Sequence, residues 1–344
     1  MKHLTLDDIA KSAGVSPATV SRVINDQVSA RSKARDRVLR VIEETGFQPH
    51  AAARSLASRR SQVIGLLIAA PAHTVLNHLN FLNLAEVLTQ ACHEKDHVLS
   101  LFLMGNGMSE QEILSKITRP GLVDGLIVRG VGGAESNQLF AQLIKSKVPF
   151  ISVGRPFQSD GISYVGSDNV MAAHKAVSHL IGRKRTRIAL LIGSPAAVYG
   201  QERIAGYRQA LQEYGMPFDG QLIINTKMAP TYPLMAALLA QRPDAILLET
   251  SMIEGVLRAL HEAGLRVPTD VAIVGFDDLP LAQTVQPALT VMRQPMNAVS
   301  HQLVSLLLDM IESRPQPPHQ VIVEQELVIR RSCGAANWAQ HSQQ

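Results

Sequence analysis

The chain of 344 residues has few of the residues on which several large classes of protein depend. It contains two cysteines, Cys92 and Cys333, which are too few and too far apart for a disulfide framework. It has no run of about 18 uncharged apolar residues, so we expect no segment to cross a membrane. Asp7 and Asp8 occupy the N-terminal stretch where a secretory signal needs an apolar core. These absences favour a cytoplasmic protein.

Motifs for catalysis and cofactor binding are also missing from the sequence. Gly130, Gly132 and Gly133 imitate a phosphate-binding loop, but the lysine and the GxGxxG spacing are absent. The histidines between residues 73 and 97 do not have the spacing of metal ligands. There is no nucleophile elbow and no HExxH motif. We therefore expect no enzyme, no cofactor and no metal site.

Positive charge is concentrated at the N-terminus. Residues 1–60 contain 11 Lys and Arg against 6 Asp and Glu, whereas the rest of the chain contains 22 against 23. A basic head on a nearly neutral body indicates contact with a polyanion, although a solvated basic surface would have the same composition. The length of the chain indicates two or three domains, since a domain usually has ~100–200 residues.

The basic region has the pattern of a helix-turn-helix. Residues 6–13 place small and apolar side chains on one helical face, and Gly14 permits the tight turn that follows. Ser16 is a favourable N-cap for a second helix from Pro17 to about Asn25, whose outer face is small, polar and basic. This second helix would enter the major groove of DNA. A third helix, about 32–45, closes the small core with Val38, Leu39, Val41 and Ile42.

Together these motifs resemble the DNA-binding headpiece of the LacI/GalR family of bacterial transcriptional repressors. The resemblance rests on LTLDDIA at 4–10, GVS at 14–16, TVSRVIN at 19–25, GFQP at 46–49 and ARSLA at 53–57. Phe47, His50 and Arg31 depart from the usual family residues without undermining the resemblance.

The resemblance implies how the headpiece binds DNA. Residues 51–58 would form a short hinge helix only on DNA, and Leu56 would then wedge between the two central base pairs from the minor groove. The operator would be a double-stranded pseudo-palindrome bound by a homodimer. The residues expected to contact DNA are Thr5, Ser16, Pro17, Ala18, Thr19, Ser21, Arg22, Asn25, His50, Ala53, Arg54 and Leu56.

From residue 61 onward, short apolar runs alternate with helical stretches. This alternation predicts an α/β fold with parallel sheets, right-handed crossovers and ligands at the carboxyl ends of the strands. There are more strands than one sheet would hold, so we expect two lobes. The expected strands are 63–68, 98–102, 125–128, 149–153, 187–192, 222–224, 245–248 and 271–274.

By the same resemblance, the body is similar to periplasmic sugar-binding proteins, with two parallel sheets and a cleft between the lobes. The expected domains are a headpiece at 1–46, a hinge helix and linker at 47–60, an effector-binding and dimerisation domain at 61–331, and a polar tail at 332–344. The N-lobe would contain about 61–163 plus 292–322, and the C-lobe about 164–291 plus 323–331.

Polar residues that follow strands are the candidates for an effector site. The resemblance implies that Arg203 and Asp277 hydrogen-bond effector hydroxyls, which an arginine fork and a carboxylate can each grip in pairs. A surface ion pair for Arg203 and a helix N-cap for Asp277 are the alternatives. Asp168 suits a cap or a contact between lobes better than a ligand contact. Glu249 stands where relatives often place Asn or Asp.

The first lobe contributes further candidates. Gly154 replaces an acidic sugar contact found in some family members, and Arg155 is the nearest polar substitute. The loop from Ala69 to His73 should line the cleft. Tyr232 could stack on a sugar, but packing is the simpler interpretation.

The sequence therefore predicts a dimeric transcriptional regulator, a repressor, whose operator affinity is controlled by a small molecule. The expected effector is a sugar or glucoside. The motifs around residues 153–169 are most similar to those of the family members that respond to maltose-type glucosides. A purine or nucleoside effector is the alternative, and a solute-binding protein is a more remote one that the headpiece argues against. The polar C-terminus has no leucine heptads, so we expect dimers without a tetramerising coiled coil.

Overall fold

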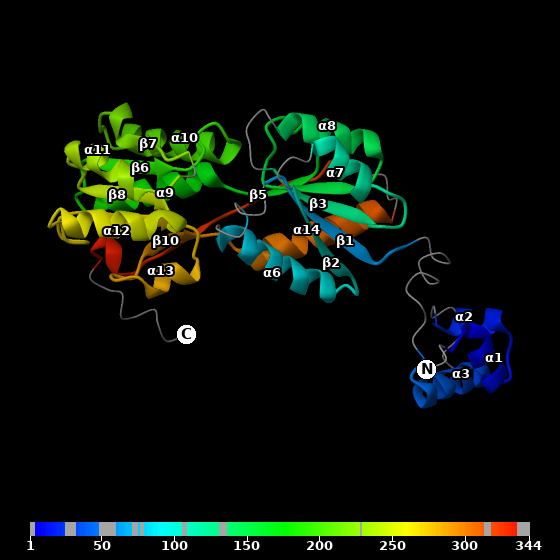
Figure 1. Ribbon diagram of the computed structural model, residues 1–344. Coiled ribbons are helices and arrows are strands. Elements are labelled where there is room, and N and C mark those ends of the chain that lie inside the picture. Colours follow the sequence, from blue (N-terminus) through cyan, green and yellow to red (C-terminus); the bar gives the residue numbers. More distant parts are fainter. Residues whose placement is uncertain are drawn as a thin grey trace. The chain divides into compact units, whose positions relative to one another are not determined.

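The computed structural model describes residues 4–24, 32–47, 60–70, 75, 79–104, 109–130, 136–227, 229–312 and 318–335. The chain divides into two compact units, Met1–Gln62 and Val63–Gln344. Figure 1 shows the three-helix headpiece and the α/β body that these units form. In the part of the chain described, no helix is both long and apolar enough to cross a bilayer.

The headpiece has the predicted helix-turn-helix. It consists of α1 (Leu6–Ala13), α2 (Pro17–Ile24) and α3 (Lys33–Thr45), with Gly14 in the left-handed region at φ 64° between the first two. Leu39 is 43% exposed, so the prediction that it closes the core was wrong. Phe47 is buried in the headpiece core, although we had placed it in the hinge. Its side chain belongs to one buried cluster with residues of all three helices, such as Ile9, Val20 and Val38.

The first lobe of the body is built on a six-stranded parallel sheet in the order β11-β5-β4-β3-β1-β2. Two helices, α6 (Leu79–His93) and α14 (Met296–Ile311), contribute to the hydrophobic core on one side of the sheet. The core on the other side includes α7 (Glu110–Ile117) and α8 (Ser136–Ser146). The strands are β1 (Val63–Ile68), β2 (Val98–Leu103), β3 (Gly125–Arg129), β4 (Phe150–Val153), β5 (Tyr164–Ser167) and β11 (Gln320–Val323).

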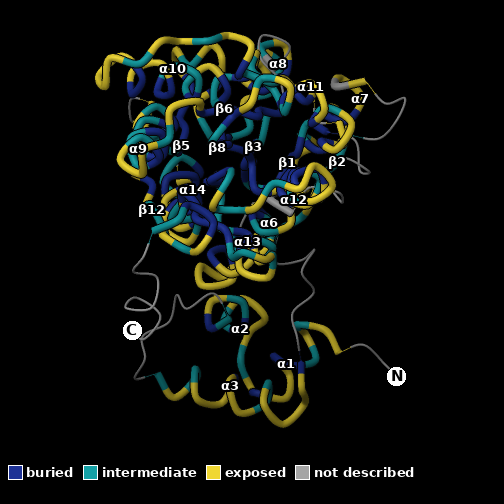
Figure 2. Tube along the Cα trace, turned by 90° about the vertical axis from the view of Figure 1, so that its left-hand side faces the viewer, coloured by how far each residue is buried: buried dark blue, intermediate teal, exposed yellow. Residues whose placement is uncertain are grey.

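The second lobe repeats this plan with the order β12-β10-β9-β8-β6-β7, in which only β12 runs antiparallel. One core contains α9 (Asn169–Gly182) and α10 (Val198–Glu213), and the other contains α11 (Met235–Ala240), α12 (Ile253–Glu262) and α13 (Pro280–Thr284). Central strands of both lobes are buried (Figure 2). The strands are β6 (Ile188–Ile192), β7 (Ile223–Asn225), β8 (Ala245–Glu249), β9 (Ala272–Phe276), β10 (Thr290–Arg293) and β12 (Glu326–Val328).

The chain passes between the lobes three times: after β5, between β10 and α14, and between β11 and β12. The predicted lobe boundaries were therefore displaced by a few residues. β5 still belongs to the first sheet because it pairs with β4 and β11, and β10 lies wholly in the second sheet. The polar tail begins later than residue 332, since Ser332 and Cys333 are buried in the second lobe.

Candidate functional site

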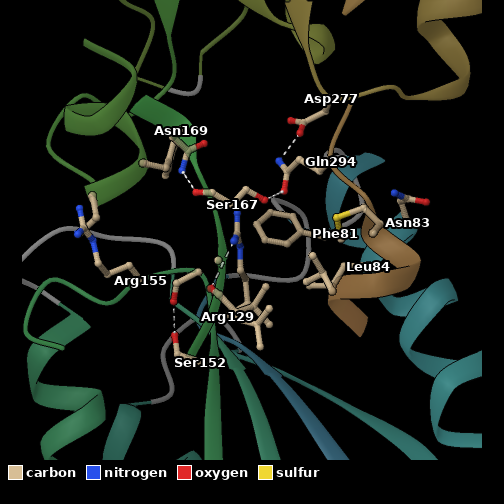
Figure 3. Close-up of a pocket in the computed structure, with 18 of the residues that line it drawn as sticks. Phe81, Asn83, Leu84, Arg129, Ser152, Arg155, Ser167, Asn169, Asp277 and Gln294 are labelled. Atoms are coloured by element: carbon tan, nitrogen blue, oxygen red, sulfur yellow. Dashed lines mark hydrogen bonds between the residues drawn. The ribbon is translucent and has the colours of Figure 1, made fainter. Parts of the chain in front are cut away.

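A cavity of about 620 Å³ lies where the two sheets of the body present the carboxyl ends of their strands. Its volume is within the ~300–1,000 Å³ that is usual for small-molecule sites. Residues that follow β3, β4, β8 and β9 line it, together with the first turns of α10 and the crossover segments. Figure 3 shows how side chains from both lobes converge on this space.

Arg203 forms the buried centre of the second-lobe wall. Its guanidinium lies 3.9 Å from the ring centre of Phe276 and 5.1 Å from that of Tyr199. Its Nη1 donates to Glu249 Oε1 at 3.4 Å, whereas its buried Nε has no hydrogen-bond partner. The surface ion pair that we weighed for Arg203 is therefore excluded. A buried donor without a partner is costly and is suited to receive an oxygen from a ligand.

Glu249 completes this pair at the end of β8. It is buried, and its Oε1 also accepts the backbone N–H of Gly193 at 3.2 Å. Burial raises the pKa of Glu249, while the charge of Arg203 and the Gly193 hydrogen bond oppose that rise. The side chain is thus fixed at the cavity wall, at the last residue of β8.

Asp277 lies directly after β9 with a left-handed backbone, φ 73°. Its N–H donates to Met292 O at 2.9 Å, its carbonyl accepts the Thr250 hydroxyl at 2.6 Å, and its carboxylate accepts the Gln294 side-chain amide. The N-cap position of α13 belongs to Leu279, so Asp277 is not that cap. The neighbouring Asp278 has a structural role, because Arg330 and Arg293 hold its carboxylate at 2.7–2.8 Å.

The first-lobe wall carries two arginines. Arg155, which we predicted, forms an ion pair with Glu202 on α10 of the other lobe. Arg129 at the end of β3 was not predicted; its Nη1 lies 3.4 Å from the carbonyl oxygen of Val153, and burial lowers its pKa. Its place after an expected strand was the signal that could have identified it.

Hydrogen bonds connect the cavity to the crossovers. Gln294 donates to Asp277 and accepts the Ser167 hydroxyl at 2.8 Å. Asn169 donates to Ser167 O at 3.2 Å and to Glu202 at 2.8 Å. Because Gln294 and Ser167 lie on two different crossovers, the hydrogen bonds join side chains at the cavity wall to segments that connect the two lobes. These polar residues were missed by the sequence analysis.

Other expected residues lie outside the cavity wall. Asp168 is the N-cap of α9, accepting Met171 N–H at 2.8 Å, which was the alternative that we favoured. Ala69 packs against the first-lobe core and is not among the lining residues. Tyr232 packs on Arg258 and donates to Glu262, so it is a packing residue. His73 lies outside the described residues.

The exposed face of α2 carries the expected DNA-contacting side chains. Ser16, Pro17, Ala18 and Arg22 are exposed, and Thr19 and Ser21 are half-buried. Ser16 also caps the helix by accepting Thr19 N–H at 3.2 Å. Thr5 forms a capping box with Asp8 at the start of α1. The remaining expected contacts, Asn25, His50, Ala53, Arg54 and Leu56, fall outside the residues that the structure describes.

Two regions of the chain match known families. Residues 5–50 match "Bacterial regulatory proteins, lacI family", and residues 177–333 match "Periplasmic binding protein-like domain". The chain is 32% identical to the HTH-type transcriptional regulator CelR of Thermobifida fusca over 95% of this chain and 98% of that protein. It is 30% identical to catabolite control protein A of Staphylococcus xylosus, over 92% and 97% of the two chains.

Solved structures agree with this relationship. A CelR–cellobiose complex superposes with a TM-score of 0.73 at 30% identity, covering 96% of this chain and 99% of that one. The lac repressor dimer bound to operator and the anti-inducer ONPF has a TM-score of 0.80 over 97% and 100% of the chains, and at 23% identity it shows the shared fold. The chain therefore belongs to the LacI family of bacterial regulatory proteins and is a DNA-binding transcriptional regulator.

Proposed function

We propose that this regulator is a repressor whose operator affinity is controlled by a sugar or glucoside bound in the cleft. The observation that carries the proposal is that Arg203, Glu249 and Asp277 line one cavity, where they bring together a guanidinium and two carboxylates. Arg203 and Glu249 are buried, and Arg203 Nε has no hydrogen-bond partner among the described residues. Sugar hydroxyls both donate and accept hydrogen bonds, and so they match such a mixed set. The similar structure of CelR with cellobiose supports the same ligand class.

The cavity also has surfaces that suit the apolar faces of a sugar ring. Phe81 and Phe157 contribute from the first lobe, and Tyr199 contributes from the second. Binding between lobes links the ligand to their relative rotation, because Asp277 is bonded to Gln294 at a crossover. A ligand with different affinities for two lobe arrangements would shift their populations, which is what control of DNA binding requires. The chain would act by binding alone, without enzymatic activity or a cofactor.

The outer face of α2 is proposed to contact base edges in the major groove of DNA, with Arg22 contacting a guanine. The operator would be a pseudo-palindrome with half-sites about one helical turn apart and a flexible central CpG step. Leu56 would open that step as a wedge. Replacing Leu56 with Ala should weaken specific binding much more than non-specific binding.

A homodimer would match the symmetry of this operator. The first lobe has a candidate surface in Leu82 on α6 and in Val98 and Leu101 on the edge strand β2, all of which are exposed apolar residues. Exposed apolar residues on a sheet edge favour an interface with another chain.

A thermal-shift screen of the purified chain with sugars, glucosides and nucleobases tests the effector class. A ligand present at about 100 times its Kd adds roughly 2.7 kcal/mol to the free energy of unfolding. The active compound should then alter operator binding in a gel shift. The purine alternative is favoured by relatives such as the repressor PurR of Vibrio parahaemolyticus, 27% identical; stabilisation by nucleobases and not by any saccharide would replace the sugar proposal.

A further inference from the structure

The two walls of the cavity have opposite charge. Among the described lining residues, the charged side chains of the first lobe are two arginines, and the second lobe has four carboxylates and two arginines. The first-lobe residues are Arg129 and Arg155, and those of the second lobe are Glu202, Glu249, Asp277, Asp278, Arg203 and Arg293. A ligand that enters this field is therefore oriented by it.

Most of these charges already have a partner of opposite sign. Arg155 pairs with Glu202 across the cleft, and Arg203 pairs with Glu249. Asp278 is shared by Arg293 and Arg330. Because these charges already compensate one another, a charged group of a ligand would gain little by binding beside them.

Arg129 differs from the other arginines of the cavity. None of the described carboxylates lies within ion-pair distance of it, and its contact with the Val153 carbonyl is long at 3.4 Å. Beside it, Gly154 contributes no side chain: a Cβ built on Gly154 would lie 3.4 Å from Arg129 Nη1. The Arg129 guanidinium is partly buried and has no directly paired carboxylate, although the negative charges of Asp277 and Glu249 also act on it. An anionic group of a ligand bound to Arg129 would supply the direct counter-charge that the described residues do not.

We propose that the effector is a saccharide bearing one anionic group, a carboxylate or a phosphate, which binds Arg129. This inference rests on the proposed function and specifies its ligand. The hydroxyls of the saccharide would lie toward Asp277 and Glu249, because those carboxylates accept hydrogen bonds and repel an anion. Arg129 belongs to β3 and Asp277 follows β9, so the ligand would contact both lobes at once.

The test is calorimetric titration of the full chain with ligands matched in size. The probes are glucose, gluconate and glucose 6-phosphate, together with cellobiose and cellobionate. At least one anionic probe should bind ten or more times more tightly than the neutral sugar from which it derives. Comparison of gluconate with glucose 6-phosphate distinguishes a carboxylate from a phosphate. Arg129→Gln should reduce this preference to less than about threefold, whereas Arg129→Lys should retain most of it.

Arg119→Gln is the matched control, because Arg119 is an exposed cation of the same lobe and does not line the cavity. It should keep the full preference for the anion. Equal or tighter binding of the neutral probes by the wild-type chain would overturn the inference and leave the sugar-responsive function intact. Preference retained in Arg129→Gln would overturn the role of Arg129. Failure of every saccharide to bind, with a nucleobase active in the thermal-shift screen, would instead reject the proposed ligand class.

Discussion

Arg203 is positioned before any ligand binds. Its guanidinium lies over the rings of Phe276 and Tyr199, and it donates a hydrogen bond to Glu249. A side chain held in this way loses little conformational entropy when it binds a ligand. Asp277 is similarly fixed through its backbone bonds to Met292 and Thr250. Less of the free energy of binding is therefore spent on ordering these side chains, and more of it contributes to affinity for the proposed effector.

Replacing Arg203 or Asp277 with alanine should abolish the response to the effector. Each change removes charge-assisted hydrogen bonds worth roughly 1.5–3 kcal/mol apiece, so the effector Kd should rise about tenfold to a hundredfold or more. Operator binding without effector should survive, because both residues lie in the body and not in the DNA-binding unit. Calorimetry and operator gel shifts measure the two properties. Unchanged effector affinity in both variants would place the binding site elsewhere.

Arg22 is an exposed arginine on the face of α2 that is proposed to contact DNA. It is exposed on α2, and its Nε has a long contact of 3.4 Å with Ala18 O, so the guanidinium remains available for a base. Arg22→Ala should lose about 1–3 kcal/mol of discrimination at one base position of each half-site. Selection of binding sites from a random DNA library measures this change. Uniform weakening across all sequences would identify Arg22 as a phosphate contact.

Periodicity predicted the three helices of the headpiece, and the lengths of the apolar runs predicted the buried strands of the body. The eight expected strands are all present. β5, β10, β11 and β12 were not recognised; each has only three or four residues. The pairs β5–β11 and β10–β12 also join segments that are far apart in the chain, which local patterns do not reveal. Their omission explains the displaced lobe boundaries.

The same limit applies to the site. Resemblance and strand ends indicated Arg203, Glu249, Asp277 and Arg155, all of which line the cavity. The crossover amides Gln294 and Asn169 have no local pattern, since their roles come from partners brought close by the fold. Burial and pairing of a charge cannot be deduced from spacing alone.

The contact between α9 and α10 depends on Gly206. A Cβ at this position would lie 2.0 Å from Val170 O and 3.0 Å from the Ala173 Cβ, and the first of these is backbone that cannot move alone. Gly206→Ala should therefore destabilise the body by about 1–3 kcal/mol or more. Denaturation followed by circular dichroism would show a lower midpoint.

Gly182→Ala serves as the control for that experiment. Gly182 ends α9, and a Cβ there meets no atom within 4 Å. Alanine should be neutral or should stabilise the chain by about 0.4–1 kcal/mol, because it reduces the entropy of the unfolded state. Equal midpoints for the two variants would show that the helix contact adjusts without cost.

If an effector controls DNA binding as proposed, a change in the body must alter the binding of the headpiece to DNA. Three crossovers join the lobes, and Gln294 and Ser167 bind each other across two of them. An effector that changed the lobe arrangement would act on the segments that this hydrogen bond joins.

A dimer would convert this change into control of DNA binding, and Leu101 provides its test. Leu101 is 46% exposed on edge strand β2, whose neighbours Leu99 and Leu103 pack against the core that contains α6. A lysine there would remain solvated in a monomer, whereas in an interface it would bury an unpaired charge. Leu101→Lys should therefore yield monomers at micromolar concentration by light scattering, while Ile144→Lys, a change at an exposed residue of α8, should leave the dimer intact.

Since two linked headpieces bind two half-sites with an avidity of about 10²–10⁴, operator affinity should fall by a comparable factor in Leu101→Lys. A dimeric Leu101→Lys with normal operator affinity would show that the interface lies on another face.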